Sequence, residues 1–279
     1  MLRKKNDAVS EAIKSVVKEL MDRVMVRVLE EDPFIKEEHH VKKPLYAALV
    51  PDEIFKGSHF ERRFVTPFGN VWEKLAVVVA KEYHKSCIQG HEINGNVAEE
   101  RLRRIQEVLN NLEKKKKDGG KSPNWDAELK YILEGGGNAI PTKVICYIYI
   151  DSKTTGEKLA FELKAPLPNS DQTKVSKEKI FKLLAMDPPP VNMAYYALPY
   201  NPYGKKEDYA WAFPKRWFNM NEAVSVLIGN EFWDLVGGDG TYQNFINEVN
   251  NLGSEYKDRI YREFLGIEPP EGSNQNVLK

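Results

Sequence analysis

Two strand-like segments joined by a turn constrain the fold of this chain more than any other feature. Residues 142–151 read TKVICYIYID and are rich in β-branched and aromatic side chains, which predicts a buried strand. The next residues, SKTTGE, have turn composition, and Gly156 can adopt a positive φ. Residues 158–165 then read KLAFELKA, where Leu159, Phe161 and Leu163 alternate with polar or small residues. The pattern predicts a β-hairpin over about 142–166 that is packed on one face.

Helical patterns lie on both sides of the hairpin. Apolar residues recur at helical spacing over 8–31, and Pro33 is expected to end that helix. Residues 191–201 are predicted to form another strand, and no segment has the composition of a free linker. We therefore predict one α/β domain over residues 1–279, with a central mixed β-sheet flanked by helices and helical additions at both ends. The other predicted helices cover 71–85, 97–121, 127–137, 175–186 and most of the tail from Asn221.

Composition narrows the class of protein. Basic and acidic residues number 41 each, so the net charge gives no indication of a nucleic acid or another charged partner. The two cysteines, Cys87 and Cys146, exclude a disulfide scaffold and suit a reducing compartment. The sequence has neither a signal peptide nor an apolar run of membrane-spanning length, so we expect a cytoplasmic protein. His84, Cys87 and His91 have superficially metal-like spacing, but they do not complete a zinc site.

Glu162 and Lys164 stand on the polar face of the second strand, at its end. In an extended strand two such residues lie about 7 Å apart. A carboxylate there can hold a hard cation, and the ammonium can stabilise a water molecule or a phosphate oxygen. These groups are typical of magnesium-dependent phosphodiester hydrolysis. The alternative interpretation is an exposed charged pair on an edge strand.

The hairpin followed by FELKAPLPNSDQ resembles the catalytic strand of the nuclease superfamily whose motif is Asp…(Asp/Glu)-x-Lys. Similarity to TdeIII-type type II restriction endonucleases rests on three blocks: FERRFVTPFGNVWEKLAVVVA at 60–80, ELKAPLPNSDQ at 162–172, and the long segment 200–242. The resemblance leaves out the first 40 residues and the charged segment 97–121. It implies a restriction-endonuclease-like fold and a magnesium-dependent homodimer that cleaves double-stranded DNA at a short palindrome, of the GGNCC kind. It also implies a cognate DNA methyltransferase that protects the host sites.

The superfamily pattern requires a further acid on the first strand of the hairpin. A two-residue turn at Thr155-Gly156 would place Glu162 opposite Tyr149, so this acid is expected near positions 145–147. Those positions hold isoleucine, cysteine and tyrosine. Asp151 is the nearest substitute, because in this register it shares a face with Glu162 and lies diagonally across from it. The other interpretation of Asp151 is the residue that starts the turn.

The resemblance thus implies that Asp151, Glu162 and Lys164 are catalytic, with Lys164 positioning the attacking water. Asp151, Glu162 and Glu73 are the predicted ligands of Mg2+. Glu73 lies in the predicted helix 71–85, and related nucleases often supply a helix-borne carboxylate. Its alternative role is a first-turn acid that offsets the helix dipole. Glu134, before a glycine run, is a weaker candidate.

Candidate DNA contacts lie in the first block, in and just after the second, and in the third, where Lys205, Lys206, Lys215 and Arg216 are further candidates. Amide side chains can read base edges, lysine and arginine can hold phosphates, and arginine is favoured for guanine. The alternatives are a polar turn and helix cap after Lys164, and ordinary surface charge for the arginines. The predicted contacts are Arg62, Arg63, Asn169, Gln172 and Lys174, with Lys177 and Lys179 also close to the proposed site.

Two other functions also fit the sequence. The first is a sequence-specific DNA-binding protein with a degraded nuclease site, because no acid occurs at 145–147. The second is a structural helical protein with an incidental hairpin, which would show no salt-sensitive affinity for DNA.

Overall fold

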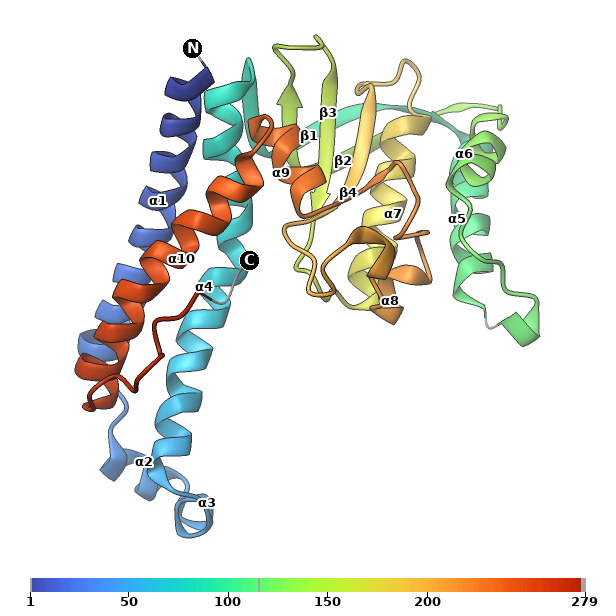
Figure 1. Cartoon of the computed structure of the whole chain (residues 1–279). Coiled ribbons are helices and arrows are strands. Elements are labelled where there is room, and N and C mark those ends of the chain that lie inside the picture. Colours follow the sequence, from blue (N-terminus) through green and yellow to red (C-terminus); the bar gives the residue numbers. More distant parts are fainter. Residues whose placement is uncertain (1, 115, 277–279) are drawn as a thin grey trace. The chain divides into compact units, whose positions relative to one another are not determined.

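The computed structural model describes residues 2–114 and 116–276, and these form two compact units (Figure 1). We call them the helical unit, residues 2–75 with 243–276, and the sheet unit, residues 76–242. Both boundaries fall inside continuous helices, α4 (Asp52–Tyr83) and α10 (Thr241–Arg259). No linker separates the units, and the single domain over 1–279 stays a prediction.

The helical unit contains α1 (Leu2–Val26), which continues through a π-helical segment, Arg27–Glu31. The predicted helix over 8–31 is therefore confirmed, and its apolar stripe is buried. Tyr256 of α10 joins α1 through a hydrogen bond from its Oη to Asp22 Oδ1 at 2.5 Å. The remaining elements of this unit are α2 (Lys36–Lys42), α3 (Pro44–Leu49), the first part of α4, and the π-helix Ile260–Leu265.

Helix α4 begins 19 residues before the predicted start at 71, and Pro67 lies inside it. The reason is a ladder of aromatic side chains at four-residue spacing. Phe60, Phe64, Phe68 and Trp72 form successive ring contacts, with centroids 6.3, 5.0 and 5.1 Å apart. Side chains four residues apart meet only on a helix, so this stripe favours helix through the proline.

In the sheet unit, the described residues form a five-stranded sheet of order β1-β2-β3-β4-β5. The first three strands pair antiparallel, whereas β3–β4 and β4–β5 pair parallel. The predicted α/β class with a mixed central sheet is therefore confirmed. The strands are β1 (Ser86–Ala98), β2 (Ala139–Asp151), β3 (Lys158–Leu163), β4 (Met193–Leu198) and β5 (Val226–Ile228).

Helix α7 (Ser170–Ala185) is the crossover between the parallel strands β3 and β4. It packs with α5 (Glu99–Glu113) and α6 (Trp125–Leu133) in the main core, where Trp125 stacks on Phe181 at 5.1 Å. On the other side of β3, Phe232 of α9 (Asn230–Gly237) contacts Phe161 at 5.8 Å. Helices therefore flank the sheet, as predicted. The short elements are Lys116–Asp118, Lys206–Asp208 and α8 (Ala212–Lys215).

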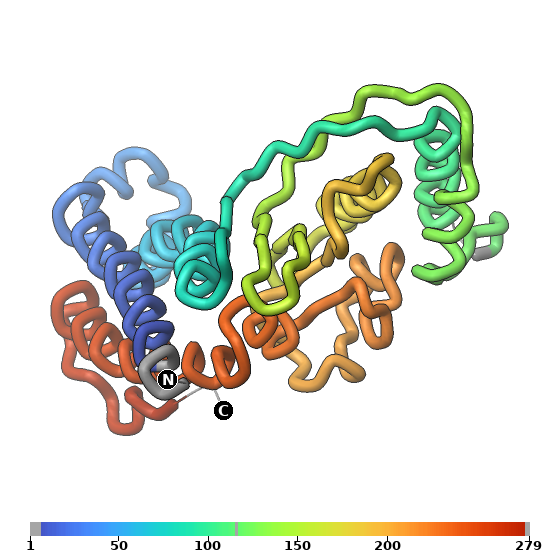
Figure 2. The backbone as a smooth tube through the Cα atoms, turned by 90° about the horizontal axis from the view of Figure 1, so that it is seen from above, coloured from blue at the N-terminus to red at the C-terminus, as the bar shows by residue number. Residues whose placement is uncertain are grey.

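Strand β1 was not predicted, and the helix expected over 97–121 is shorter at both ends. Polar residues interrupt β1, and only Cys87, Ile93 and Val97 on it are buried. The strand forms because it pairs along its length with β2 in a ribbon that runs out to α5 (Figure 2). This pairing also puts His91 about 13 Å along the strand from Cys87. Among the described residues, no group of three His, Cys, Asp or Glu side chains could hold a metal.

No helix in the described part of the chain is both long and apolar enough to span a bilayer.

We expect Gly237→Ala to lower the free energy of unfolding by about 1–3 kcal/mol through overpacking. A Cβ at this buried end of α9 would lie 2.6 Å from Thr241 Oγ1 and would also overlap Val79. Gly253, inside α10, is the matched control, because a Cβ there would contact nothing within 4 Å. Gly253→Ala should raise the free energy by up to about 1 kcal/mol. Urea denaturation measures both changes, and an unchanged Gly237→Ala protein would contradict the first.

We also expect both cysteines to resist alkylation in the folded protein. Burial raises the pKa of the Cys87 and Cys146 thiols to about 12. At pH 8 only about one thiol in 10,000 would then be a thiolate, which is the reactive form. Iodoacetamide labelling followed by mass spectrometry should be slow in buffer and fast in urea. Rapid labelling of the folded chain at pH 8 would show that the thiols are accessible.

Candidate active site

Glu162 and Lys164 lie at the end of a central strand, not an edge strand. Strand β3 pairs with β2 on one side and β4 on the other. Glu162 is 1% exposed, and the Lys164 side chain is 11% exposed. The backbone N–H of Lys164 donates to the Ala197 carbonyl of β4 at 3.0 Å, so pairing continues past the strand. The interpretation as an exposed surface pair is therefore wrong.

Helix α7 covers the Glu162 carboxylate and supplies donors to it. Lys179 Nζ lies 3.2 Å from Oε1 and 3.3 Å from Oε2, and Ser176 Oγ donates to Oε2 at 3.3 Å. Lys164 Nζ is 4.0 Å from Oε2. Ser176 and Lys179 are three residues apart, which places them on one face of the helix. One buried carboxylate is thus held between two ammonium groups.

The superfamily pattern expects an acid at residues 145–147. In this chain these residues instead supply uncharged contacts to the two lysines. Lys164 Nζ lies 3.7 Å from the centroid of the Tyr147 ring, and Lys179 Nζ lies 5.0 Å from the same ring. Lys179 also donates to the Ile145 carbonyl at 2.8 Å. An aromatic face and a carbonyl oxygen both attract a cation. The strand therefore offers the lysines uncharged partners where a second carboxylate was expected.

Burial sets the electrostatics of the Glu162 carboxyl. Removal from water raises its pKa above the ordinary value, and the charges of Lys179 and Lys164 oppose that shift. The ionised form is favoured further when a cation binds directly to the carboxylate. With two ammonium groups and one carboxylate, the site carries a local positive charge that suits an anionic substrate.

The loop that follows Lys164 is fixed by aromatic residues from the 200–242 block. Tyr209 Oη donates to the Pro166 carbonyl at 2.8 Å, and Trp211 Nε1 donates to the Pro168 carbonyl at 2.9 Å. Trp217 Nε1 donates to Ser170 Oγ at 3.0 Å. These bonds hold the chain between β3 and α7, so the positions of Lys164 and Lys179 are coupled through a rigid connection.

The predicted hairpin register is wrong by two residues. Asp151 pairs with Lys158 and Tyr149 with Ala160, whereas Glu162 was expected opposite Tyr149. The connection spans residues 152–157, because buried Ser152 closes it: its N–H donates to the Glu157 carbonyl at 2.8 Å. In the true register Glu162 is four positions along the strand from the partner of Asp151, about 13 Å away.

This register affects the metal ligands predicted from the sequence. Asp151 and Glu162 are too far apart to share one ion, and the Asp151 carboxylate lies 3.3 Å from Lys85 Nζ. Glu73 lies in α4 within the helical unit and remains a prediction. Glu134 ends α6 and is exposed. Glu162 is thus the carboxylate that this site offers. Mg2+ commonly takes only one or two protein carboxylates, with phosphate oxygens and waters as the other ligands, so the residues fit that ion.

The DNA contacts predicted after Lys164 lie at the N-terminal end of α7, from its N-cap to its second turn. Asn169 is the N-cap of this helix, and its Oδ1 accepts from the Gln172 N–H at 2.8 Å, so the helix-cap interpretation is confirmed. Lys174 Nζ pairs with Glu113 at 2.6 Å, and the Gln172 side chain is exposed. Lys177 is buried against Glu128 at 2.6 Å and is a structural group. Contact of Asn169, Gln172 and Lys174 with DNA stays a prediction.

Lys179 and Ser176 are the site residues whose roles the sequence did not indicate. Lys179 was expected to hold phosphate, but here it contacts Glu162. One sequence feature could have predicted this contact, namely the length of the helix after β3. A helix that connects β3 to a parallel neighbour crosses over the sheet and lies over the end of β3. Residues 176 and 179 then fall on its inner face.

Comparisons with known proteins show the family of this chain. A model of the family described as type II restriction endonuclease, HinfI, matches residues 9–253. The type II restriction enzyme HgiCII of Herpetosiphon aurantiacus is 26% identical over 226 residues, which cover 80% of this chain and 82% of that enzyme. HgiBI from the same organism is 25% identical over 227 residues, covering 80% and 81%. No solved structure matches the chain. The length of the family match shows that this chain belongs to the HinfI family of type II restriction endonucleases.

Proposed function

We propose that the protein cleaves double-stranded DNA in a magnesium-dependent reaction at a short palindrome of the GGNCC kind. Within its family we assign it to the TdeIII type and to the Asp…(Asp/Glu)-x-Lys superfamily. The observation that carries the proposal is the buried Glu162 carboxylate between Lys164 and Lys179 at the end of β3. The names of the relatives, all type II restriction enzymes, support DNA as the substrate.

The chain's own groups have separate roles in this reaction. Glu162 would hold Mg2+, which when bound polarises the phosphate and acidifies a water molecule. Lys164 would orient that water for in-line attack on phosphorus and stabilise charge that develops on the phosphate oxygens. The bond from phosphorus to the 3′ oxygen breaks, which leaves 5′-phosphate and 3′-hydroxyl ends. Lys179 acts as a positioning residue, because it holds the Glu162 carboxylate from the helix side.

The second candidate function is sequence-specific DNA binding without cleavage. One observation favours it: positions 145–147 supply an aromatic ring and a carbonyl to the site in place of an acid. A site with one carboxylate would bind magnesium weakly before DNA arrives.

We expect Lys164→Ala to lose cleavage by at least about a hundredfold while it keeps specific binding, because the group that orients the water is removed. Lys158→Ala is the matched control, since Lys158 begins the same strand and is exposed. Plasmid cleavage in Mg2+ and in EDTA, with binding measured by fluorescence anisotropy, tests both variants.

The outcomes separate the two candidate functions. Full activity of Lys164→Ala would remove the motif assignment. A wild-type protein that binds one sequence tightly but cuts no unmethylated DNA would favour the second candidate instead.

We further propose that the enzyme is a cytoplasmic homodimer whose host sites are protected by a cognate methyltransferase. A palindrome presents the same half-site twice, so a two-fold symmetric protein reads it most simply. Three apolar side chains of α2 and α3 supply a suitable contact, because Val41, Leu45 and Leu49 are 82%, 77% and 81% exposed. Large apolar side chains at this density mark protein–protein surfaces.

We expect Leu49→Glu to shift the protein from dimer to monomer, because it places a charge in an apolar contact. Leu133→Glu, an equal change at an exposed position of α6, should leave the dimer intact. Light scattering after size exclusion gives the masses, and circular dichroism confirms folding. A wild-type monomer would contradict the homodimer, and a dimeric Leu49→Glu would contradict this surface.

A further inference from the structure

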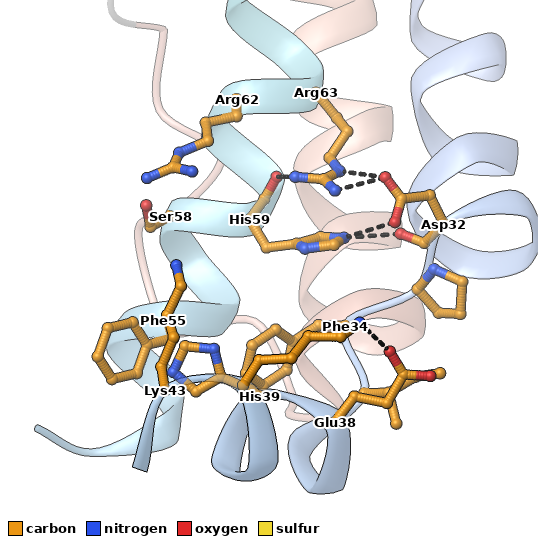
Figure 3. A pocket seen from close by; sticks show the side chains of 13 residues that line it. Asp32, Phe34, Glu38, His39, Lys43, Phe55, Ser58, His59, Arg62 and Arg63 are labelled. Carbon is orange, nitrogen blue, oxygen red and sulfur yellow. Dashed lines mark hydrogen bonds and ion pairs between the residues drawn. The ribbon is translucent and has the colours of Figure 1, made fainter. Parts of the chain in front are cut away.

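A pocket of about 310 Å³ lies in the helical unit. The loop after α1, helix α2 and the first half of α4 enclose it, as Figure 3 shows. Four basic side chains line it together with two acids, two histidines and Ser58. None of these groups takes part in the chemistry assigned to Glu162 and Lys164.

Pairing cancels two of the four positive charges. Arg63 Nε donates to Asp32 Oδ2 at 2.8 Å, and its Nη2 contacts the same oxygen. Lys42 Nζ pairs with Glu38 at 2.6 Å. Within residues 2–114 and 116–276, neither Arg62 nor Lys43 forms an ion pair. Two lining cations therefore have no counter-charge within ion-pair distance among the described residues.

The uncompensated groups gather along one edge of the pocket. Figure 3 shows the Arg62 guanidinium, the Ser58 hydroxyl and the Lys43 ammonium on the same side, with Arg63 and Asp32 opposite. Arg62 and Ser58 are four residues apart on α4, so they share a helix face. A planar guanidinium, a hydroxyl and an ammonium together form a donor set that matches phosphate oxygens.

The floor of the pocket is held rigid and carries one unsatisfied donor or acceptor. The His39 ring packs against Phe55 at 4.2 Å and Phe34 at 5.6 Å. Its Nε2 is buried and has no hydrogen-bond partner among the described residues. His59 is fixed by a bond from Nε2 to the Asp32 carbonyl at 2.6 Å. A buried polar atom without a partner is costly unless a ligand or water satisfies it.

We propose that this pocket binds a phosphate group of the DNA backbone, with Arg62, Lys43 and Ser58 as the donors. The inference rests on the proposed function, because it takes duplex DNA as the substrate. It separates the two adjacent arginines: Arg62 contacts phosphate, and Arg63 positions the pocket wall through Asp32. Such a contact contributes affinity on any sequence and does not read bases.

Salt dependence of binding tests the assignment. In a Lys164→Ala background, binding of a duplex with the cleavage site and of an unrelated duplex is measured between 50 and 200 mM NaCl. Each phosphate contact contributes about 0.9 to the slope of log K against log salt. Arg62→Ala and Lys43→Ala should each reduce the slope by about that amount on both duplexes. Lys14→Ala, the control, removes an exposed charge from α1, far along the helix from Asp32, and should leave the slope unchanged.

The other outcomes contradict either the proposed function together with this inference, or this inference alone. A parent protein that binds neither duplex overturns the proposed function as well as this inference. A parent that binds DNA with the same slope as Arg62→Ala overturns the inference alone. A last experiment uses inorganic phosphate as the ligand and measures the melting temperatures of the parent and of Arg62→Ala. If phosphate raises the melting temperature of the parent alone, and the salt slopes of DNA binding are equal for the two proteins, the pocket binds free phosphate and not the DNA backbone. Circular dichroism verifies that each variant is folded.

Discussion

The sheet unit depends on how the Glu162 carboxylate is compensated where it is buried. An ionised carboxyl without partners in that position would cost several kcal/mol, and burial accordingly raises its pKa. Lys179 from α7 and Lys164 from the strand end offset part of that cost. Lys179 can reach the carboxylate only if α7 lies over the end of β3. This position of α7 makes it the crossover that brings β4 parallel to β3. The local fold and the buried Glu162 carboxylate therefore specify each other.

The aromatic residues of the 200–242 block support the same arrangement from outside. Tyr209, Trp211 and Trp217 donate hydrogen bonds to the loop and to the start of α7, and each brings a large apolar ring to the core. A loop held at three points leaves little freedom for Lys164. The role proposed for Lys164 needs a position accurate to well under an ångström, and a rigid loop beside a strand end meets that need better than a mobile one.

Much of this fold could be predicted from local pattern. The helix over 8–31 and strands β2, β3 and β4 follow from periodicity, and the pairing of Glu162 with Lys164 from their spacing. The hairpin register could not, because it depends on the burial of Ser152 in a longer turn. Strand β1 was missed because its stability comes from pairing with β2 and not from its own alternation. The contact of Lys179 with Glu162 joins residues 17 positions apart, which no local pattern encodes.

In both units, charge pairing distinguishes basic side chains that an acid holds from those that form no ion pair among the described residues. Lys177 and Arg63 looked like candidates for DNA contact, but each is held by an acid 49 or 31 residues away in sequence. Arg62 and Lys43 are also an arginine and a lysine, but neither forms an ion pair in the part of the chain that the structure describes. An exposed lysine or arginine keeps its full charge for a ligand only when the fold brings no acid to it. Sequence counts balance at 41 of each sign, so the distinction lies entirely in which charges the fold places together. A net charge of zero is therefore compatible with a local excess of positive charge, such as the one at Arg62 and Lys43 in the pocket of the helical unit.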